Sequence, residues 1–472
     1  MGFTFPGNPF ANVAITTSIV MFLWIPVVFY IFMRFPPKRA IVIGVVLAWL
    51  YLPEATLSLP GLPDYSKVSA TSYGALLATF FFYSGRFANF RFSWLDVPML
   101  IWCLCPFASS LSNGLGAYDG FAATVEQIMT WGIPYFLGRI YISSLEGFRQ
   151  LALGIFIGGL SYIPLCFFEI RFSPQLHRLV YGDGAFADFT QSIRFGGYRP
   201  TVFLRHGLAV GAFMMVATLA GIWLWKSGTL KKLWGIPIQW LVGALFITFV
   251  LVKSSGAYLL LAMGLGIFIV ARQLHSALPV FLLIGAMAGY LYLNTQTDTY
   301  FTDQLVSVLS SIFPEDRIQS LEFRFNNEEL LADKARERFW FGWAGYGRAL
   351  VPLDNYGRVT VQDSLWIIAF GHNGIVGLIS LFTAMLLPVT ALFWSRYPAR
   401  LWSNPKVAPV AAIAVAVTLY MVDCILNAMI NPIYIFAVGG ISGLALKPRE
   451  KTQTAKRKAQ RLVPAQQQLV QQ

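Results

Sequence analysis

Arginines gather in one polar segment near the middle of the chain, residues 171–206, which holds five arginines and two aspartates. The residues of interest stand just before or within the start of a long apolar stretch: Arg194, Arg199, Arg205 and His206. Pro200 disfavours helix at Arg199, so we expect Arg199 to end a loop as the next helix begins. A planar guanidinium suits phosphate oxygens, so the segment predicts a phosphate or pyrophosphate site. The alternative is that these side chains reach lipid phosphates at a membrane surface.

A second polar segment, residues 295–363, carries seven basic and eleven acidic residues and is too long for a simple connection. Within it, residues 318–341 predict an amphipathic helix. Its apolar face is expected to hold Leu321, Phe325, Leu330, Leu331, Ala335 and Phe339. Arg324 lies early in this helix, and the alternative to a functional role is a surface ion pair with Glu328, four residues on. A glycine-rich stretch, residues 342–348, follows the helix.

Three further polar residues lie at or within later apolar stretches. Asp363 comes with Ser364 where a helix is expected to begin, so it is either a general base, an orienter of a sugar hydroxyl, or part of a helix N-cap. His372 is nine residues further on, about 13 Å along an ideal helix. It is a possible accessory base, and the alternative is a histidine hydrogen-bonded within the protein. Asp423, near the middle of another apolar stretch, is expected to have an internal partner.

The elements that position these residues are predicted to be membrane helices. Of 472 residues, 56% are hydrophobic and 12% charged, against about 25% charged in a soluble protein. The mean hydropathy is +0.60. These values exclude a cytoplasmic globular enzyme, a disordered chain and a nucleic-acid-binding domain, despite a formal charge of +13. No clustered set of metal ligands is visible, so neither a metal nor a cofactor is expected.

A membrane-spanning helix needs about 20 mainly apolar residues. We therefore predict an all-α, polytopic helix bundle over residues 1–446, with about 13 transmembrane helices (range 12 to 14) and one large helical outer loop. The expected spans are 11–33, 39–53, 70–85, 93–112, 121–138, 150–170, 202–225, 235–252, 254–272, 277–294, 364–394, 407–427 and 431–446. Of these, 39–53 and 431–446 are short and suggest re-entrant segments as an alternative.

The distribution of basic residues predicts the orientation. With the N-terminus outside and the C-terminus in the cytoplasm, most basic residues of the short loops face the cytoplasm, as the positive-inside rule expects. The short outer loops then hold only Lys67 and Lys253. The basic, glutamine-rich tail, residues 447–472, is predicted to be disordered and cytoplasmic and to touch anionic lipid headgroups.

With these features the chain resembles the O-antigen ligase/polymerase family, bacterial inner-membrane proteins that handle polyprenyl-pyrophosphate-linked glycans. The resemblance covers roughly residues 190 to 385 by motif and the rest by hydropathy. It rests on the arginine segment before a mid-chain span, the Lys253-Ser254-Ser255-Gly256-Ala257 turn, and the late outer loop with its amphipathic helix and its Trp343–Arg348 glycine-rich stretch. A polar pair ahead of a Gly-x-x-Gly helix completes it.

The resemblance implies a metal-independent glycosyltransferase that polymerises or ligates these glycans at the outer face of the inner membrane. Its partners would be the polyprenyl-pyrophosphate-linked donor, a glycan or lipid acceptor, and membrane lipid. It places Arg199 or Arg205 at the family's first phosphate-binding arginine and Arg324 at the second, with Arg194 as a further binding residue. Asp363 takes the position of the catalytic residue, with His206 and His372 as accessory candidates.

The sequence departs from the ligases at two points. Asp363-Ser364 stands where the ligases have a His-Asn type pair, and Ser254-Ser255 stands where many relatives have Ser-Arg. Both departures favour a polymerase or an exopolysaccharide variant. The alternatives are a transporter or flippase of lipid-linked glycans, and a glycosyltransferase that uses single polyprenyl-phosphate sugars and has acids in an outer loop, here Glu54 and Asp64. The glycan, the acceptor and the oligomeric state do not follow from the sequence.

Overall fold

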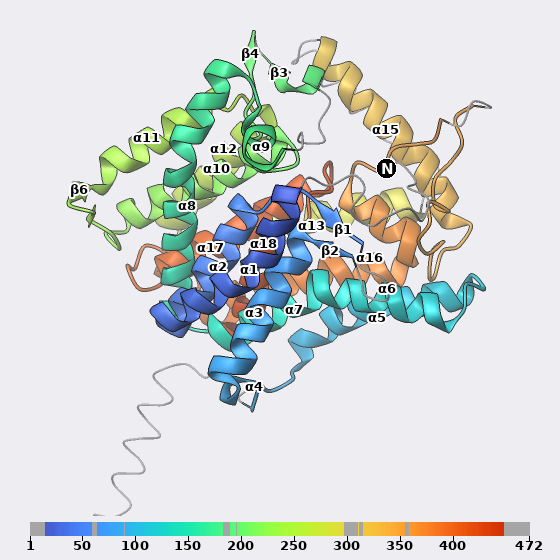
Figure 1. Cartoon of the computed structure of the whole chain (residues 1–472), viewed down its shortest axis with the longest axis horizontal. Coiled ribbons are helices and arrows are strands. Elements are labelled where there is room, and N and C mark those ends of the chain that lie inside the picture. The colour runs from blue at the N-terminus through green and yellow to red at the C-terminus, as the bar shows by residue number, and fades with distance from the viewer. Residues whose placement is uncertain are drawn as a thin grey trace, which may run out of the picture.

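A computed structural model describes residues 15–58, 64–88, 90–182, 189–194, 196–296, 310, 315–354 and 358–447, apart from the side chains of residues 190 and 315–321. In these parts the chain is mainly helical, with only short two-stranded hairpins (Figure 1). The predicted tail, from residue 448 onward, and the N-terminal 14 residues lie outside the described residues, as do parts of both polar segments.

The longer helices are α1 (Ile15–Arg34), α2 (Pro37–Tyr51), α3 (Lys67–Tyr83), α5 (Val97–Ser112), α6 (Ala117–Gln127), α7 (Ile133–Tyr141), α8 (Leu145–Phe172), α10 (Gly207–Lys226), α11 (Ile238–Leu251), α12 (Ser255–Gln273), α13 (Leu278–Gln296), α15 (Glu315–Arg336), α16 (Leu365–Ala391), α17 (Ala408–Asp423) and α18 (Pro432–Ala445). Short helical pieces are α4 (Gly85–Ala88), η1 (Trp94–Asp96), η2 (Ile128–Gly132), α9 (Leu176–Tyr181), η3 (Phe189–Ser192), η4 (Leu392–Arg396) and η5 (Ala399–Leu401). The antiparallel hairpins pair β1 (Thr56–Leu57) with β2 (Tyr65–Ser66), β3 (Ile193–Arg194) with β4 (Gly197–Tyr198), and β5 (Lys232–Leu233) with β6 (Ile236–Pro237).

Each of the thirteen segments predicted to span the membrane coincides with a helix or, for 121–138, with the continuous run α6, η2 and α7. Within the described residues, seven helical stretches are long and apolar enough to cross a membrane: α1, η1 with α5, α8, α10, α12, α13, and α16 with η4. Three more apolar helices, α11, α17 and α18, are shorter. The chain is therefore helical and embedded in a membrane.

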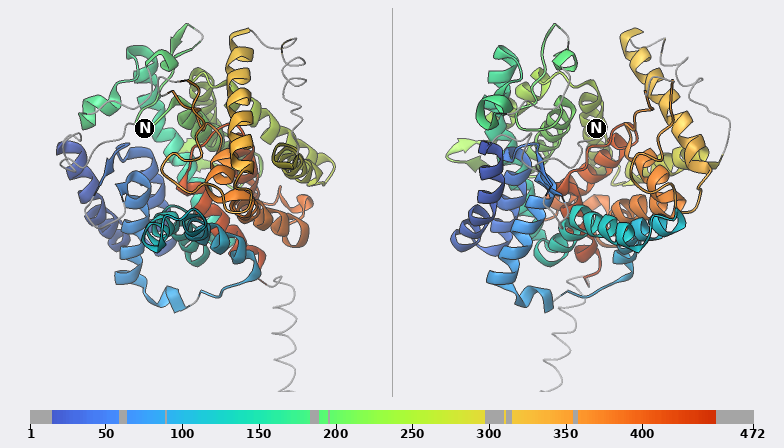
Figure 2. Two further views of the ribbon diagram at one scale, coloured as in Figure 1. Left: turned by 90° about the vertical axis from the view of Figure 1, so that its right-hand side faces the viewer. Right: turned by 45° about the vertical axis from the view of Figure 1, so that its right-hand side comes forward.

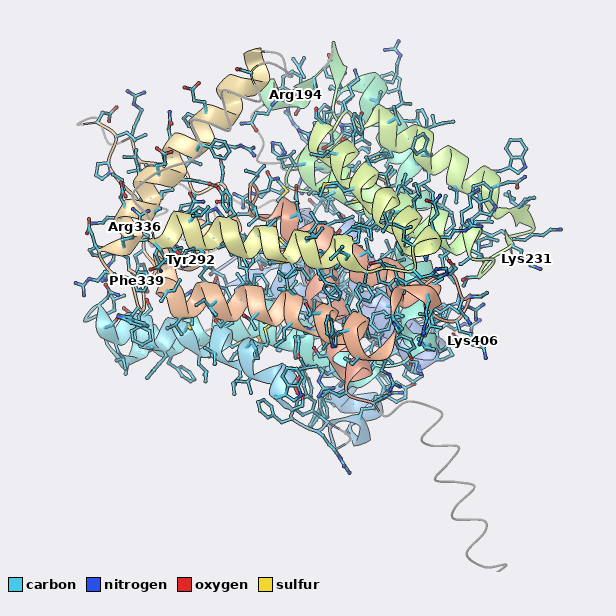
Figure 3. The ribbon with its side chains drawn as sticks, turned by 180° about the vertical axis from the view of Figure 1, so that it is seen from behind. Arg194, Lys231, Tyr292, Arg336, Phe339 and Lys406 are labelled. Carbon is cyan, nitrogen blue, oxygen red and sulfur yellow. The ribbon has the colours of Figure 1, made fainter. Side chains whose placement is uncertain are left out.

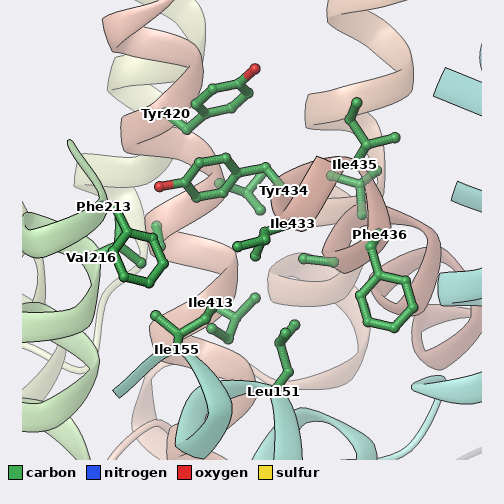
Figure 4. Close-up of a cluster of buried hydrophobic side chains, with 14 of the residues drawn as sticks. Leu151, Ile155, Phe213, Val216, Ile413, Tyr420, Ile433, Tyr434, Ile435 and Phe436 are labelled. Atoms are coloured by element: carbon green, nitrogen blue, oxygen red, sulfur yellow. The ribbon is translucent and has the colours of Figure 1, made fainter. Parts of the chain in front are cut away.

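The centre of the bundle is formed by α17 and α18, of which nearly every residue is buried. Their side chains interlock with those of α8 and α10 (Figure 4). Helices α18 and α7 pack more closely still, and glycines allow this approach. A Cβ atom on Gly439 would lie 1.9 Å from the Tyr135 carbonyl oxygen, and a Cβ atom on Gly138 would lie 1.9 Å from the Phe436 carbonyl oxygen. Small residues that let two backbones touch are typical of helix packing in membranes.

The outer surface of the bundle is apolar where a membrane would cover it. Large side chains on α1, α3, α12 and α13 are exposed, among them Phe80 (62%), Leu259 (61%) and Leu282 (61%). Lys231 and Lys406, predicted to be cytoplasmic, lie at one end of the molecule, and Arg336, predicted to be outside, lies at the other (Figure 3). Helix α15 stands beside the bundle at the same end as the β3–β4 hairpin (Figure 2).

Candidate active site

A cavity of about 1080 Å³ brings most of the predicted site residues together. Its basic lining residues are Lys67, Arg194, Arg199, Arg205, Lys253 and Arg324, and its acidic ones are Glu54, Asp363 and Asp423. His206 also lines it. Arg194 comes from β3, Arg199 and Arg205 from the chain between β4 and α10, Arg324 from α15, and Asp363 from just before α16. Residues far apart in the sequence thus meet in one cavity in which basic side chains outnumber acidic ones.

The cavity lies where two short central helices meet. Helices α17 and α18 have 16 and 14 residues, or about 24 and 21 Å at 1.5 Å per residue, against a hydrocarbon core of about 30 Å. The connection between them, residues 424–431, forms part of the cavity wall through Leu426, Asn427 and Met429. Polar groups here sit among packed helices, where the dielectric is lower than in bulk water and electrostatic interactions are stronger.

Arg199 is the most enclosed of the arginines, with 5% of its surface exposed. Its Nη2 donates a hydrogen bond to the Ser254 hydroxyl at 3.1 Å, and its main-chain N–H donates to the Ser192 carbonyl at 2.7 Å. The first residue of α10 must be small, because a Cβ on Gly207 would lie 2.7 to 2.8 Å from the Arg199 side chain. The Ser254 turn identified in the sequence therefore holds the arginine that the resemblance places at the phosphate.

The loop that carries Arg199 is fixed by Glu169, a fully buried carboxylate near the end of α8. One of its oxygens accepts hydrogen bonds from the main-chain N–H groups of Thr201 and Val202 at 2.8 and 2.7 Å. The other accepts from the N–H groups of Gln175 and Leu176 at 3.0 and 2.8 Å. Sequence analysis did not single out this residue, although a lone acid within an apolar span is itself a signal of an internal polar contact.

His206 and Arg205 lie in a different position from the one predicted. We expected both within the first two turns of a span, but α10 begins at Gly207, and His206 is its N-cap, accepting a hydrogen bond from the Leu208 N–H at 3.0 Å. The helix starts later because the chain bends after Pro200 and the His206 imidazole, rather than a preceding turn, accepts the hydrogen bond of the Leu208 N–H. Burial and the nearby arginine charges, Arg199 foremost, lower the pKa of His206 to about 4.

On the other side of the cavity, Arg324 connects two carboxylates. Its Nε lies 3.9 Å from Asp363 Oδ2, and its Nη1 donates to the Leu426 carbonyl at 3.1 Å and to Asn427 Oδ1 at 3.3 Å. Asn427 in turn donates to Asp423 Oδ1 at 2.9 Å. The internal partner expected for Asp423 is thus Asn427, but Asp423 ends α17 instead of lying mid-helix.

Arg324 does not form the surface ion pair with Glu328 that the sequence offered as the alternative. Glu328 is 4% exposed and accepts a hydrogen bond from the Tyr290 hydroxyl at 2.9 Å, because its position on α15 faces α13 and not the cavity. Burial raises the pKa of Glu328 to about 7. On the same helix Phe325, Leu331 and Ala335 are buried as predicted, whereas Leu330 is 41% exposed.

His372 does not join the site. It lies in the first, continuous part of α16, as predicted, and the helix is interrupted two residues later at Gly374, whose φ of 64° and ψ of −166° are not helical. The glycine-rich stretch packs into this break: Trp343 N–H donates to the Gly371 carbonyl at 2.8 Å and Ala344 N–H to that of His372 at 3.0 Å. His372 is absent from the cavity lining.

Ser364 also differs from a conventional N-cap. It precedes α16 with an extended backbone, but its side chain makes no capping hydrogen bond. The first helical N–H, that of Leu365, instead donates to the carbonyls of Cys424 and Asn427 at 3.1 and 3.2 Å. The N-capping alternative for Asp363 thus has no support in the geometry, and its carboxylate faces Arg324 in the cavity.

Comparison with known proteins adds no relative: no family model and no curated protein matches the chain. Among the residues that the structure describes, no group of three or more His, Cys, Asp or Glu side chains is placed to hold a metal ion. What the site offers chemically is guanidinium groups for an anion, next to carboxylates that can accept a proton.

Proposed function

We propose that the chain is a membrane glycosyl-transferring enzyme that polymerises or ligates polyprenyl-pyrophosphate-linked glycans at the outer face of a bacterial inner membrane. The observation that carries this proposal is the meeting of Arg194, Arg199, Arg205 and Arg324 with Asp363 in one cavity. A donor with a pyrophosphate leaving group and an acceptor with a reacting hydroxyl require this pairing of anion-binding and proton-accepting groups. The proposal includes the topology of about 13 spans, with the N-terminus outside and the C-terminus in the cytoplasm.

The proposed reaction is a displacement at the anomeric carbon of the donor glycan. An acceptor hydroxyl oxygen forms a bond to that carbon while the bond from the carbon to the pyrophosphate oxygen breaks. Asp363 takes the hydroxyl proton, and polyprenyl pyrophosphate leaves with the electron pair. Arg199 and Arg324 stabilise the charge that grows on the pyrophosphate, and they do so strongly because Arg199 is buried.

Complementation of a strain that lacks this gene tests the proposal. Arg199→Ala and Asp363→Asn are each expected to abolish surface polymer while the protein is still inserted in the membrane. Lys226→Ala, in the last turn of α10 and away from the cavity, is the matched control and is expected to support normal polymer. Wild-type polymer from both cavity variants would refute the assignment.

The same strains separate an enzyme from a flippase. An enzyme that is missing leaves lipid-linked glycan on the outer leaflet, whereas a missing flippase leaves it on the inner leaflet. The gathering of charged side chains in one cavity, lined by loops from one end of the bundle, favours the enzyme. Lipid-linked glycan that accumulates only on the inner leaflet would favour the flippase instead.

A further inference from the structure

A second group of polar residues lines the same cavity but belongs to different elements from the arginines. Lys67, the first residue of α3, donates hydrogen bonds from Nζ to Glu54 Oε1 at 3.0 Å and to the Phe203 carbonyl at 2.8 Å. The same ammonium stands 5.4 Å from the centre of the Trp49 ring. Trp49, Glu54 and Lys67 all line the cavity, and we call them the α2–α3 corner.

Folding alone does not explain this arrangement. A cation at the N-terminus of a helix opposes the helix dipole, which favours negative charge there. Lys67 is also only 3% exposed. Burying an ion pair costs hydration free energy, and the attraction between the two charges barely offsets that cost. An apolar residue of similar volume at this position would serve the fold as well or better. Local choices that work against stability concentrate at functional sites.

The chemistry of the corner differs from that of the arginine cluster. A phosphate is repelled by the Glu54 carboxylate, so the corner does not suit the pyrophosphate. A sugar ring suits it, because hydroxyl groups both donate to a carboxylate and accept from an ammonium, and an indole offers an apolar face. Glu54 retains 18% side-chain exposure and its main-chain N–H is held by His177 Nε2 at 3.0 Å, so its carboxylate has a fixed place in the wall.

The size of the cavity also requires more than an anion. Its volume of about 1080 Å³ is at the upper end of pockets that enclose whole drug-sized ligands, and a pyrophosphate fills a small part of it. The arginines come from the chain between η3 and α10 and from α15, whereas the corner comes from α2, its following loop and α3. One cavity therefore has an anion-binding part and a separate polar part.

We propose that Trp49, Glu54 and Lys67 form the subsite that holds a sugar ring of the glycan. This inference rests on the proposed function, of which it names the sugar-binding part. The ring belongs to the donor or to the acceptor, and the two sources share the hydroxyl chemistry that the corner recognises.

The test uses the full-length chain in lipid nanodiscs and three probes. Farnesyl pyrophosphate carries the anion without a sugar. The lipid-linked repeat unit, extracted from the strain that lacks this gene, carries both. The glycan released from that extract by mild acid carries the sugars alone. Glu54→Gln and Trp49→Phe are expected to weaken binding of the lipid-linked repeat unit at least tenfold and to leave binding of farnesyl pyrophosphate within twofold.

Two matched variants control for damage to the fold. Asp96→Asn removes the carboxylate of another buried ion pair, Asp96–Arg139 at 2.7 Å, and Trp24→Phe changes another buried tryptophan. Neither residue lines the cavity, so both controls are expected to bind all probes as the wild type does. If Glu54→Gln also weakens binding of the released glycan, the corner recognises the sugar without its lipid; if it weakens binding of the lipid-linked form alone, recognition of the ring depends on the pyrophosphate anchor.

Either of two results would overturn the inference. Wild-type affinity of Glu54→Gln and Trp49→Phe for the lipid-linked repeat unit would make the corner structural. An equal loss of farnesyl pyrophosphate binding would make it part of the anion site. Failure of the proposed function is a different result, because the wild-type protein would then bind neither farnesyl pyrophosphate nor the lipid-linked repeat unit.

Discussion

Glu328 gives a prediction whose size follows from the structure. Burial raises the pKa of this carboxyl from 4.5 to about 7, so the folded protein holds the proton that the unfolded chain releases at a lower pH. The neutral form stabilises the fold fully below pH 4.5, and this contribution is lost as the pH rises towards 7. The two pKa values differ by about 2.5, which corresponds to at most about 3 kcal/mol in the free energy of unfolding, at 1.36 kcal/mol for each pKa unit.

Glu328→Gln removes the ionisation but keeps an acceptor for the Tyr290 hydroxyl. We expect the variant to match the wild type at pH 4 and to exceed its free energy of unfolding by up to about 3 kcal/mol at pH 8. The assay is denaturant unfolding of the purified protein in one detergent across this pH range. Glu322→Gln, an exposed position on the same helix, is the control and should show no such trend. A wild-type-to-variant difference that stays constant from pH 4 to pH 8 would refute the reasoning.

Three further predictions concern the arginine side of the cavity. Gly207→Ala should displace Arg199 and reduce polymer formation at least tenfold, whereas Gly243→Ala, where an added Cβ meets no atom within 4 Å, should not; equal activity of the two variants in complemented strains would contradict this. Since the pKa of His206 is lowered to about 4, wild type and His206→Gln should give pH–rate profiles of the same shape between pH 5.5 and 7.5. An inflection near pH 6.5 found only in the wild type would show that His206 titrates there. Glu169→Ala should lower the unfolding free energy by roughly 3 kcal/mol or more, because four N–H groups, two of them fully buried, lose their acceptor. Chemical denaturation close to that of the wild type would contradict this role of Glu169.

The helices could be predicted from the sequence because apolar length alone defines a segment that must satisfy its own backbone in lipid. The predicted gathering of Arg199, Arg205, Arg324 and Asp363 follows from the same topology, since all four were placed in segments on one side of the bundle. Placing residues on the same side of the bundle does not determine which side chains contact one another, however. Arg324 faces Asp363 instead of Glu328 because Glu328 lies on the side of α15 that is buried against α13 and α16.

The features that sequence analysis missed depend on where helices end or break. Hydropathy runs smoothly through Gly374, so the interruption of α16 could not be foreseen from apolar composition. Glu54 and Lys67 lay in a short outer loop, and the pairing of β1 with β2 brings them together in the cavity wall. Glu169 lacked a visible partner in the sequence because all its partners are main-chain N–H groups.

The break at Gly374 also makes the first part of α16, residues 365–373, a separate short rod. Its lower end is held by the main chain of the glycine-rich stretch, and its upper end by the carbonyls of Cys424 and Asn427. Asp363 lies in the chain that joins this rod to α15. A displacement of α15 is therefore transmitted to Asp363 along the main chain. Arg199 is instead held by the Ser254 hydroxyl, just before α12, and by the Ser192 carbonyl. The two sides of the site are thus attached to different helices, and the connection between α17 and α18 lines the cavity together with both.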